Sequence, residues 1–176
     1  MSETEEGRKH SHRSGPWSMG AGTVVVDQER VLLVRNRFGV TRGRYLLPAG
    51  SVHAGELPDR AAERETLEET GLRVEATGLL GVRIWVMESG VHNYFFMFSA
   101  KLLSPLSELR PNLAEVDDAR FFTRDEMAAL SLDETWAGAI AVALKALDGN
   151  AHIWPNEPAL SSDSGVSTPE SWRMWM

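Results

Sequence analysis

The sequence contains no cysteine. This absence excludes disulfide bonds, thiolate metal sites and a cysteine nucleophile, so a bound metal ion would need oxygen or imidazole ligands. A chain without cysteine also has no need of an oxidising compartment.

Long apolar runs are missing as well. No uninterrupted hydrophobic stretch approaches the ~18 residues that a membrane-spanning helix requires. The N-terminal segment MSETEEGRKHSHRSG has charges and histidines where a secretory signal has an apolar segment. We therefore expect no membrane association and no export, and we expect the protein to be cytoplasmic.

Positive charge is in short supply. The 18 lysines and arginines are outnumbered by 25 acidic residues, for a formal net charge of -7, and this balance opposes strong binding to nucleic acid. Small anionic substrates remain possible if metal ions and local arginines offset that charge. With 176 residues, 43% hydrophobic and 24% charged, the chain fits a single globular domain.

The hydrophobic pattern predicts strands and helices in mixed order. Strands are expected at residues 20–26 and 31–37 as a hairpin, and then at 44–50, 72–87, 91–103 and 116–123. Helices are expected at 60–70, after Asp59 and ending at Gly71, and at 125–130 and 135–147. This order is typical of an α/β or α+β layered domain.

Composition divides the chain into three parts. Residues 1–16 are polar and predict a mobile N-terminal arm, and residues 17–148 hold all the predicted strands and helices. Residues 149–176 are rich in serine and proline and contain Trp154, Trp172 and Trp175. This C-terminal tail could pack on the domain, cap a pocket or cross to a partner chain.

The helix predicted at 60–70 concentrates negative charge on one face. At about 100° per residue, Glu65, Glu68 and Glu69 fall on the same side, and each like-charged pair costs an isolated helix roughly 0.2–0.5 kcal/mol. A divalent ion that prefers oxygen ligands, Mg²⁺ or Mn²⁺, would relieve this repulsion. Arg64 lies four residues before Glu68 and is expected to orient it.

These glutamates belong to a longer spaced pattern, GSVHAGELPDRAAERETLEETGL at residues 50–72. Its fixed positions are Gly50, Glu56, Arg64, Glu65, Glu68, Glu69, Gly71 and the aliphatic Leu72. The pattern resembles the Nudix box, the loop-helix-loop signature of the Nudix hydrolases. The preceding LLPAG and the later EVDDARFFTRDEMAAL are similar to the family too, so the resemblance extends from about Trp17 to Leu147.

The resemblance implies a fold and an activity. The fold is a Nudix-like α/β/α sandwich with a mixed central sheet. The activity is metal-dependent hydrolysis of a diphosphate (pyrophosphate) bond in a nucleoside diphosphate linked to another moiety X. Thr66, His53, Tyr45 and Ala49 depart from residues frequent in the family, but none of these departures removes a metal ligand.

Site residues follow from the match to the box. Glu68 and Glu69 are the first expected ligands of Mg²⁺ or Mn²⁺, Glu65 is a further ligand or the base that activates water, and the carbonyl of Gly50 completes the shell. Glu56 is expected to support the loop, while Arg64 orients a glutamate. The base comes either from the helix, as Glu65 or Glu69, or from a later loop, where Glu115 is the first candidate.

Residues outside the box are candidates for contacts with the nucleotide. Guanidinium groups pair well with phosphate oxygens, and aromatic rings can stack on a base. The candidates are Arg35, Arg37, Arg44, Trp85 and Tyr94.

Other functions stay open at this level. The fold could serve as a nucleotide-sensing regulatory module, which the intact glutamates argue against. Diphosphate isomerisation ordinarily calls for a cysteine, and RNA decapping is disfavoured by the net charge. A homodimer is possible, and the sequence does not identify X.

Overall fold

The computed structural model describes residues 17–149 and the backbone of 172–175. The predicted N-terminal arm and most of the predicted tail lie outside the described residues. The strands are β1 (Trp17–Asp27), β2 (Arg30–Asn36), β3 (Tyr45–Leu46), β4 (Ala49–Ser51), β5 (Val74–Val86), β6 (His92–Leu102), β7 (Val116–Thr123) and β8 (Trp172–Trp175). The helices are α1 (Pro58–Thr70), α2 (Arg124–Ala128) and α3 (Ala137–Leu147), with short 3₁₀ turns at Gly39–Thr41 and Leu106–Glu108.

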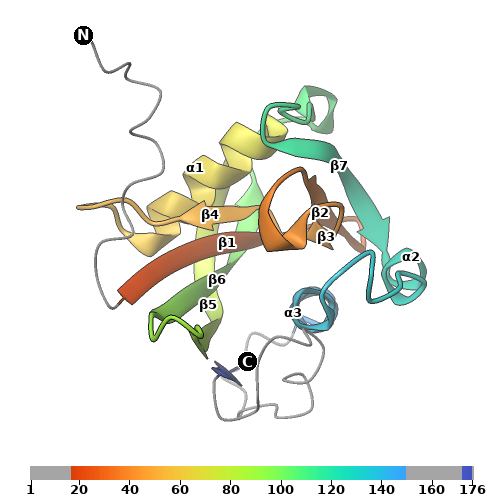
Figure 1. Ribbon diagram of the computed structural model, residues 1–176. Helices are drawn as coiled ribbons and strands as arrows, with labels where there is room; N and C mark the ends of the chain where they lie inside the picture. Colours follow the sequence, from red (N-terminus) through yellow and green to blue (C-terminus); the bar gives the residue numbers. More distant parts are fainter. Residues whose placement is uncertain (1–16, 150–171, 176) are drawn as a thin grey trace, which may run out of the picture.

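The strands form one mixed sheet in the order β3-β2-β1-β6-β5-β8, with β4 beside β1 and β7 beside β2. The pair β1–β6 is parallel and the other pairs are antiparallel. Helices α1 and α3 cover opposite sides of this sheet (Figure 1). The predicted layered α/β architecture with a mixed sheet is confirmed.

The segment predicted as one strand at 44–50 is divided in two. β3 pairs with β2, whereas β4 pairs with β1. The change of partner comes at Pro48, which has no N–H to donate to a strand ladder. The Pro48 carbonyl accepts a hydrogen bond from the amide of Thr23, on β1. Because β1 and β2 pair directly only at Val26↔Val31 and Asp27↔Arg30, β4 becomes the edge of its part of the sheet.

Helix ends differ slightly from the prediction. α1 begins at Pro58 rather than after Asp59, since proline suits the first helical position. It ends at Gly71, whose left-handed φ of 75° confirms the predicted stop. α3 begins at Ala137 rather than at Thr135, because Trp136 is extended and Thr135 forms a parallel β-bridge with Tyr45.

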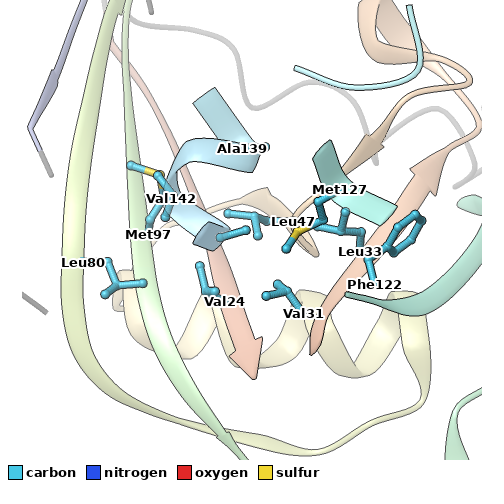
Figure 2. Close-up of a cluster of buried hydrophobic side chains, with 11 residues drawn as sticks. Val24, Val31, Leu33, Leu47, Leu80, Met97, Phe122, Met127, Ala139 and Val142 are labelled. Carbon is cyan, nitrogen blue, oxygen red and sulfur yellow. The ribbon is translucent and has the colours of Figure 1, made fainter. Parts of the chain in front are cut away.

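The main hydrophobic core lies between the sheet and helices α2 and α3 (Figure 2). It includes Val24, Leu33, Met97, Phe122 and Val142, all nearly inaccessible to solvent. The other face is covered by α1 through small side chains, with Ala61 and Ala62 packing on Ala21. α1 can therefore approach the sheet closely.

Part of the predicted tail belongs to the sheet. β8 pairs antiparallel with β5, from Val82↔Trp175 to Trp85↔Trp172. None of the helices in the described part of the chain is long and apolar enough to cross a bilayer.

Candidate active site

The open edge of β4 faces the glutamates of α1. Successive peptide groups of a strand point to opposite edges, and on one edge β4 bonds to β1. On the other edge the Ala49 amide donates to Glu69 Oε2 at 3.0 Å, and the Ser51 carbonyl accepts from Arg64 Nη2 at 3.0 Å. β4 thus fixes α1 through two side chains of the box.

Gly50 is required by a close approach. A Cβ built on Gly50 would lie 2.1 Å from Cδ of Glu65, so any larger residue would displace that carboxylate. Gly50 is the register partner of Ala21, and its carbonyl oxygen lies on the β1 side, 3.2 Å from where a Cβ of Gly20 would be. The Gly50 carbonyl, predicted as a metal ligand, therefore faces away from α1, and the neighbouring Ala49 peptide faces the glutamates instead.

Arg64 connects the acidic groups of the box. Its guanidinium donates to both oxygens of Glu56, at 2.8 and 3.0 Å, to Glu65 at 2.7 Å and to Glu68 at 3.0 Å. The predicted pairing with Glu68 is confirmed, and the pairing with Glu65 and Glu56 is additional. The Arg64 guanidinium lowers the pKa of Glu56 to about 2, and Glu56 in turn accepts from the amide of His53 at 3.0 Å, which holds the loop.

Three carboxylates from two separate parts of the chain converge. Glu65, Glu68 and Glu115 each offer an oxygen, and these oxygens all lie within 4.8 Å of one another. The backbone carbonyl of Glu115 accepts from the amide of Arg37, which ties the loop before β7 to the end of β2. The loop acid named from the sequence thus lies beside the helix acids.

Glu69, next to Glu68 on α1, is buried, with 7% of its surface exposed. Burial, reinforced by the charges of Glu65, Glu115 and Glu68, raises its pKa to about 8, against the opposing effect of the Ala49 amide. Burial also raises the pKa of Glu65. The three converging carboxylates, whose charges also act on Glu69, have an excess of negative charge that a divalent cation would neutralise, and their oxygens are the donors that Mg²⁺ and Mn²⁺ prefer.

The two acids that follow Glu115, at the start of β7, are occupied elsewhere. Asp117 forms an ion pair with Arg37 at 3.8 Å, and Asp118 accepts a hydrogen bond from the Tyr45 hydroxyl at 2.5 Å. They do not join the acidic cluster.

The arginines predicted to contact the nucleotide lie at or beside the C-terminal end of β2. Arg35 is half-buried, with its Cζ 5.7 Å from the Tyr45 ring centroid and its Nε buried without a hydrogen-bond partner. Arg37 is exposed and donates to the Leu113 carbonyl. Arg44 is half-buried just before β3.

The predicted aromatic residues lie on opposite faces of the sheet. Trp85 packs against the main core on the α3 side. Tyr94 stacks on Trp17, with ring centroids 5.9 Å apart, and pairs with Ile84, one residue out of phase with Trp85. The two rings cannot line the same pocket.

Arg83, in the middle of β5, is a half-buried cation that was not among the residues predicted from the sequence. The available signal was a charged residue inside the apolar run LLGVRIWV, in the alternation that places Trp85 on the α3 side. The Ala49 peptide was not predicted either, because the direction of a backbone group depends on strand register.

Residues 16–143 match the family model of the NUDIX domain, and the chain belongs to the Nudix family. An uncharacterized Nudix hydrolase of Listeria monocytogenes, lmo0368, is 38% identical over 85 residues, which cover 48% of this chain and 48% of that protein. The mitochondrial NAD(P)H pyrophosphatase NUDT13 of Homo sapiens is 32% identical over 60% of this chain and 29% of its own length. A NUDIX hydrolase structure from Nitrosomonas europaea aligns with a TM-score of 0.63 at 25% identity, over 75% of this chain and 89% of that chain.

The chain spans less than half the length of these two curated relatives. The matched part contains the box, the β4 edge and the loop before β7, the segments that form the acidic cluster.

Proposed function

We propose that this protein is a divalent-metal-dependent pyrophosphohydrolase that cleaves a diphosphate bond in a nucleoside diphosphate linked to another moiety. The observation that carries the proposal is the convergence of Glu65 and Glu68 from the box with Glu115 from a distant loop. An exposed acidic face with no ligand would not need a glycine at residue 50 to admit a carboxylate.

The residues fit Mg²⁺ or Mn²⁺. Glu65, Glu68 and Glu69 would hold the ion, and the backbone carbonyl of Ala49, rather than that of Gly50, would complete its ligands. When bound, the ion neutralises charge on the phosphate oxygens and makes water a stronger nucleophile at neutral pH.

The chain itself positions the groups around the phosphates. Arg64 fixes the carboxylates of Glu65 and Glu68 through its hydrogen bonds, and so pre-organises the cluster. The Glu115 side chain has no hydrogen-bond partner among the described residues and is free to accept a proton from the attacking water. Arg35 and Arg37, at the end of β2, would bind phosphate oxygens.

Hydrolysis assays with Mg²⁺ or Mn²⁺ would test this function. The panel should contain nucleoside triphosphates, nucleotide sugars, ADP-ribose, NADH and dinucleoside polyphosphates, with products identified by mass. We expect cleavage within a diphosphate linkage that EDTA abolishes. A folded, metal-binding protein that cleaves none of these compounds would favour the nucleotide-sensing alternative.

The Glu115→Gln variant tests whether Glu115 acts as the base or as a metal ligand. Glu115→Gln should lower kcat strongly while Mn²⁺ affinity, measured by calorimetry, changes less than in Glu68→Gln. Equal losses of Mn²⁺ affinity in both variants would make Glu115 a ligand rather than the base.

A further inference from the structure

A half-buried cation lies on the α3 side of the sheet, away from the acidic cluster. Arg83, on β5, is held between two aromatic rings, with its Cζ 4.9 Å from the Phe95 ring centroid and 5.2 Å from that of Trp136. The faces of aromatic rings attract guanidinium groups, so these contacts stabilise the side chain in one orientation.

The charge of Arg83 has no counter-ion among the described residues. Its Nη2 donates to Asn93 Oδ1 at 2.6 Å, while its Nε is buried without a partner. Burial alone lowers its pKa to about 10, with no carboxylate acting against that effect. A desolvated charge and an unused donor are costly unless a partner satisfies them.

Asn93, an uncharged side chain, links the Arg83 guanidinium to Ser18 through two hydrogen bonds. The Asn93 amide Nδ2 donates to Ser18 Oγ at 3.0 Å, which directs Oδ1 towards Arg83. An aspartate would fit the same space and neutralise the charge. The described residues thus fix the arginine in place and leave its charge without a counter-ion.

Arg83 and the acidic cluster lie on opposite faces of the sheet, over strands that are near one another. Between them, β4, β1, β6 and β5 are consecutive neighbours, so β4 and β5 are separated by three strand spacings, roughly 14 Å. The Phe95 ring covers Gly20 and Gly22, where an added Cβ would lie 2.8 and 3.3 Å from it. An added Cβ at Gly22 would also lie 2.7 Å from the Cβ of Ala49, the residue whose amide binds Glu69.

We propose that Arg83 is a specificity-determining residue that binds an anionic oxygen, of a phosphate or a carboxylate, on the part of the substrate remote from the cleaved diphosphate bond. The assignment of this anion to a substrate rests on the proposed function, whereas anion binding by Arg83 does not depend on hydrolysis. Asn93 is the positioning residue, since it fixes the guanidinium without touching the anion.

The experiment is an NMR titration of the full chain with inorganic phosphate in EDTA, where no hydrolysis takes place. The observed signal is the Arg83 Nε–H, assigned by its loss in Arg83→Lys and its retention in Arg73→Lys, a matched change at an exposed arginine. We expect the signal to shift saturably with millimolar phosphate. A signal that does not move up to about 50 mM phosphate, far above such a dissociation constant, would overturn the proposal.

Asn93→Asp keeps Arg83 and tests the same idea without removing a core contact. The new carboxylate should pair with the guanidinium, raise the melting temperature and weaken phosphate binding at least tenfold. If Asn93→Asp raises the melting temperature and leaves phosphate affinity unchanged, phosphate binds elsewhere and Arg83 only packs against its aromatic neighbours. Loss of hydrolysis in the panel would not affect either titration, so the two proposals fail separately.

Discussion

The two helices that cover the sheet are built from opposite kinds of side chain. α3, AGAIAVALKAL, has Lys145 as its one charged residue and buries Ala139, Val142 and Ala143 in the main core. α1, PDRAAERETLEET, buries alanines and threonines and, among them, the carboxylate of Glu69. The α3 face is therefore shaped by apolar packing, whereas the α1 face gives up apolar area to hold acids in fixed positions. Substitutions in the α1 acids and in the apolar core under α3 should separate activity from stability.

The largest effect is expected from Glu69→Gln on the α1 face. Its pKa of about 8 in the metal-free protein means that the fold already tolerates the neutral form, and glutamine can keep the hydrogen bond from Ala49. We expect kcat/KM to fall by roughly 1000-fold, equivalent to about 4 kcal/mol, with the metal-free melting temperature unchanged. Full turnover in a folded variant would remove Glu69 from the site.

Phe122→Ala makes the converse change on the α3 face. Phe122 is fully buried in the main core, and removal of such a ring costs about 3–5 kcal/mol of unfolding free energy. Urea denaturation should show this loss, while kcat per folded molecule at low temperature stays near that of the parent. A matched loss of kcat in fully folded protein would show that the two faces are coupled.

Gly50→Ala adds a methyl group between β4 and the Glu65 side chain of α1. The added Cβ would overlap the carboxylate of Glu65, and overpacking of this kind costs about 1–3 kcal/mol. Because the displaced group is a site residue, we expect Mn²⁺ affinity to fall about tenfold or more. Gly78→Ala, where an added Cβ meets nothing within 4 Å, is the control, and equal behaviour of both variants would contradict the role given to Gly50.

The sequence predicted those features that depend on neighbouring residues. The acidic face of α1 and its end at Gly71 follow from helical spacing and from the glycine conformation. The hairpin β5–β6 follows from two apolar runs around ESG. Helical spacing also predicted that Arg64 pairs with Glu68, and the two side chains are hydrogen-bonded.

Features that depend on distant partners were not predictable in the same way. The division of residues 44–50 into β3 and β4 depends on β1 and β2, two different partners. The direction of the Gly50 carbonyl depends on the register with Ala21, and the environment of Arg83 depends on Trp136, far along the chain. The pairing of β8 with β5 likewise involves residues that local composition assigns to a tail.

Glu56→Gln is a smaller test of the α1 side, with a definite pH dependence. Arg64 lowers the pKa of Glu56 from 4.5 to about 2, so the charged form stabilises the fold fully above pH 4.5 and this contribution disappears as the pH falls towards 2. We expect a loss of about 1–2 kcal/mol at pH 7 and a smaller decrease of stability between pH 4.5 and 2 than in the parent. Glu88→Gln, at an exposed turn, should keep the parent's pH profile, and an identical profile for Glu56→Gln would remove the ion pair as the cause.

The smallest effect is expected inside the α1 interface itself. Thr66 donates to the Ala62 carbonyl at 2.8 Å, so the buried contact of 2.7 Å with Thr23 must use the Thr23 hydroxyl as donor. Thr66→Val removes that acceptor and should cost about 1 kcal/mol, because the Thr23 hydroxyl stays buried without a partner. Adding Thr23→Val removes the stranded hydroxyl, so the double variant should be more stable than Thr66→Val alone. If urea denaturation instead shows the two losses to be additive, the threonine pair does not hold α1 on the sheet, and the small apolar contacts of Ala61 and Ala62 suffice.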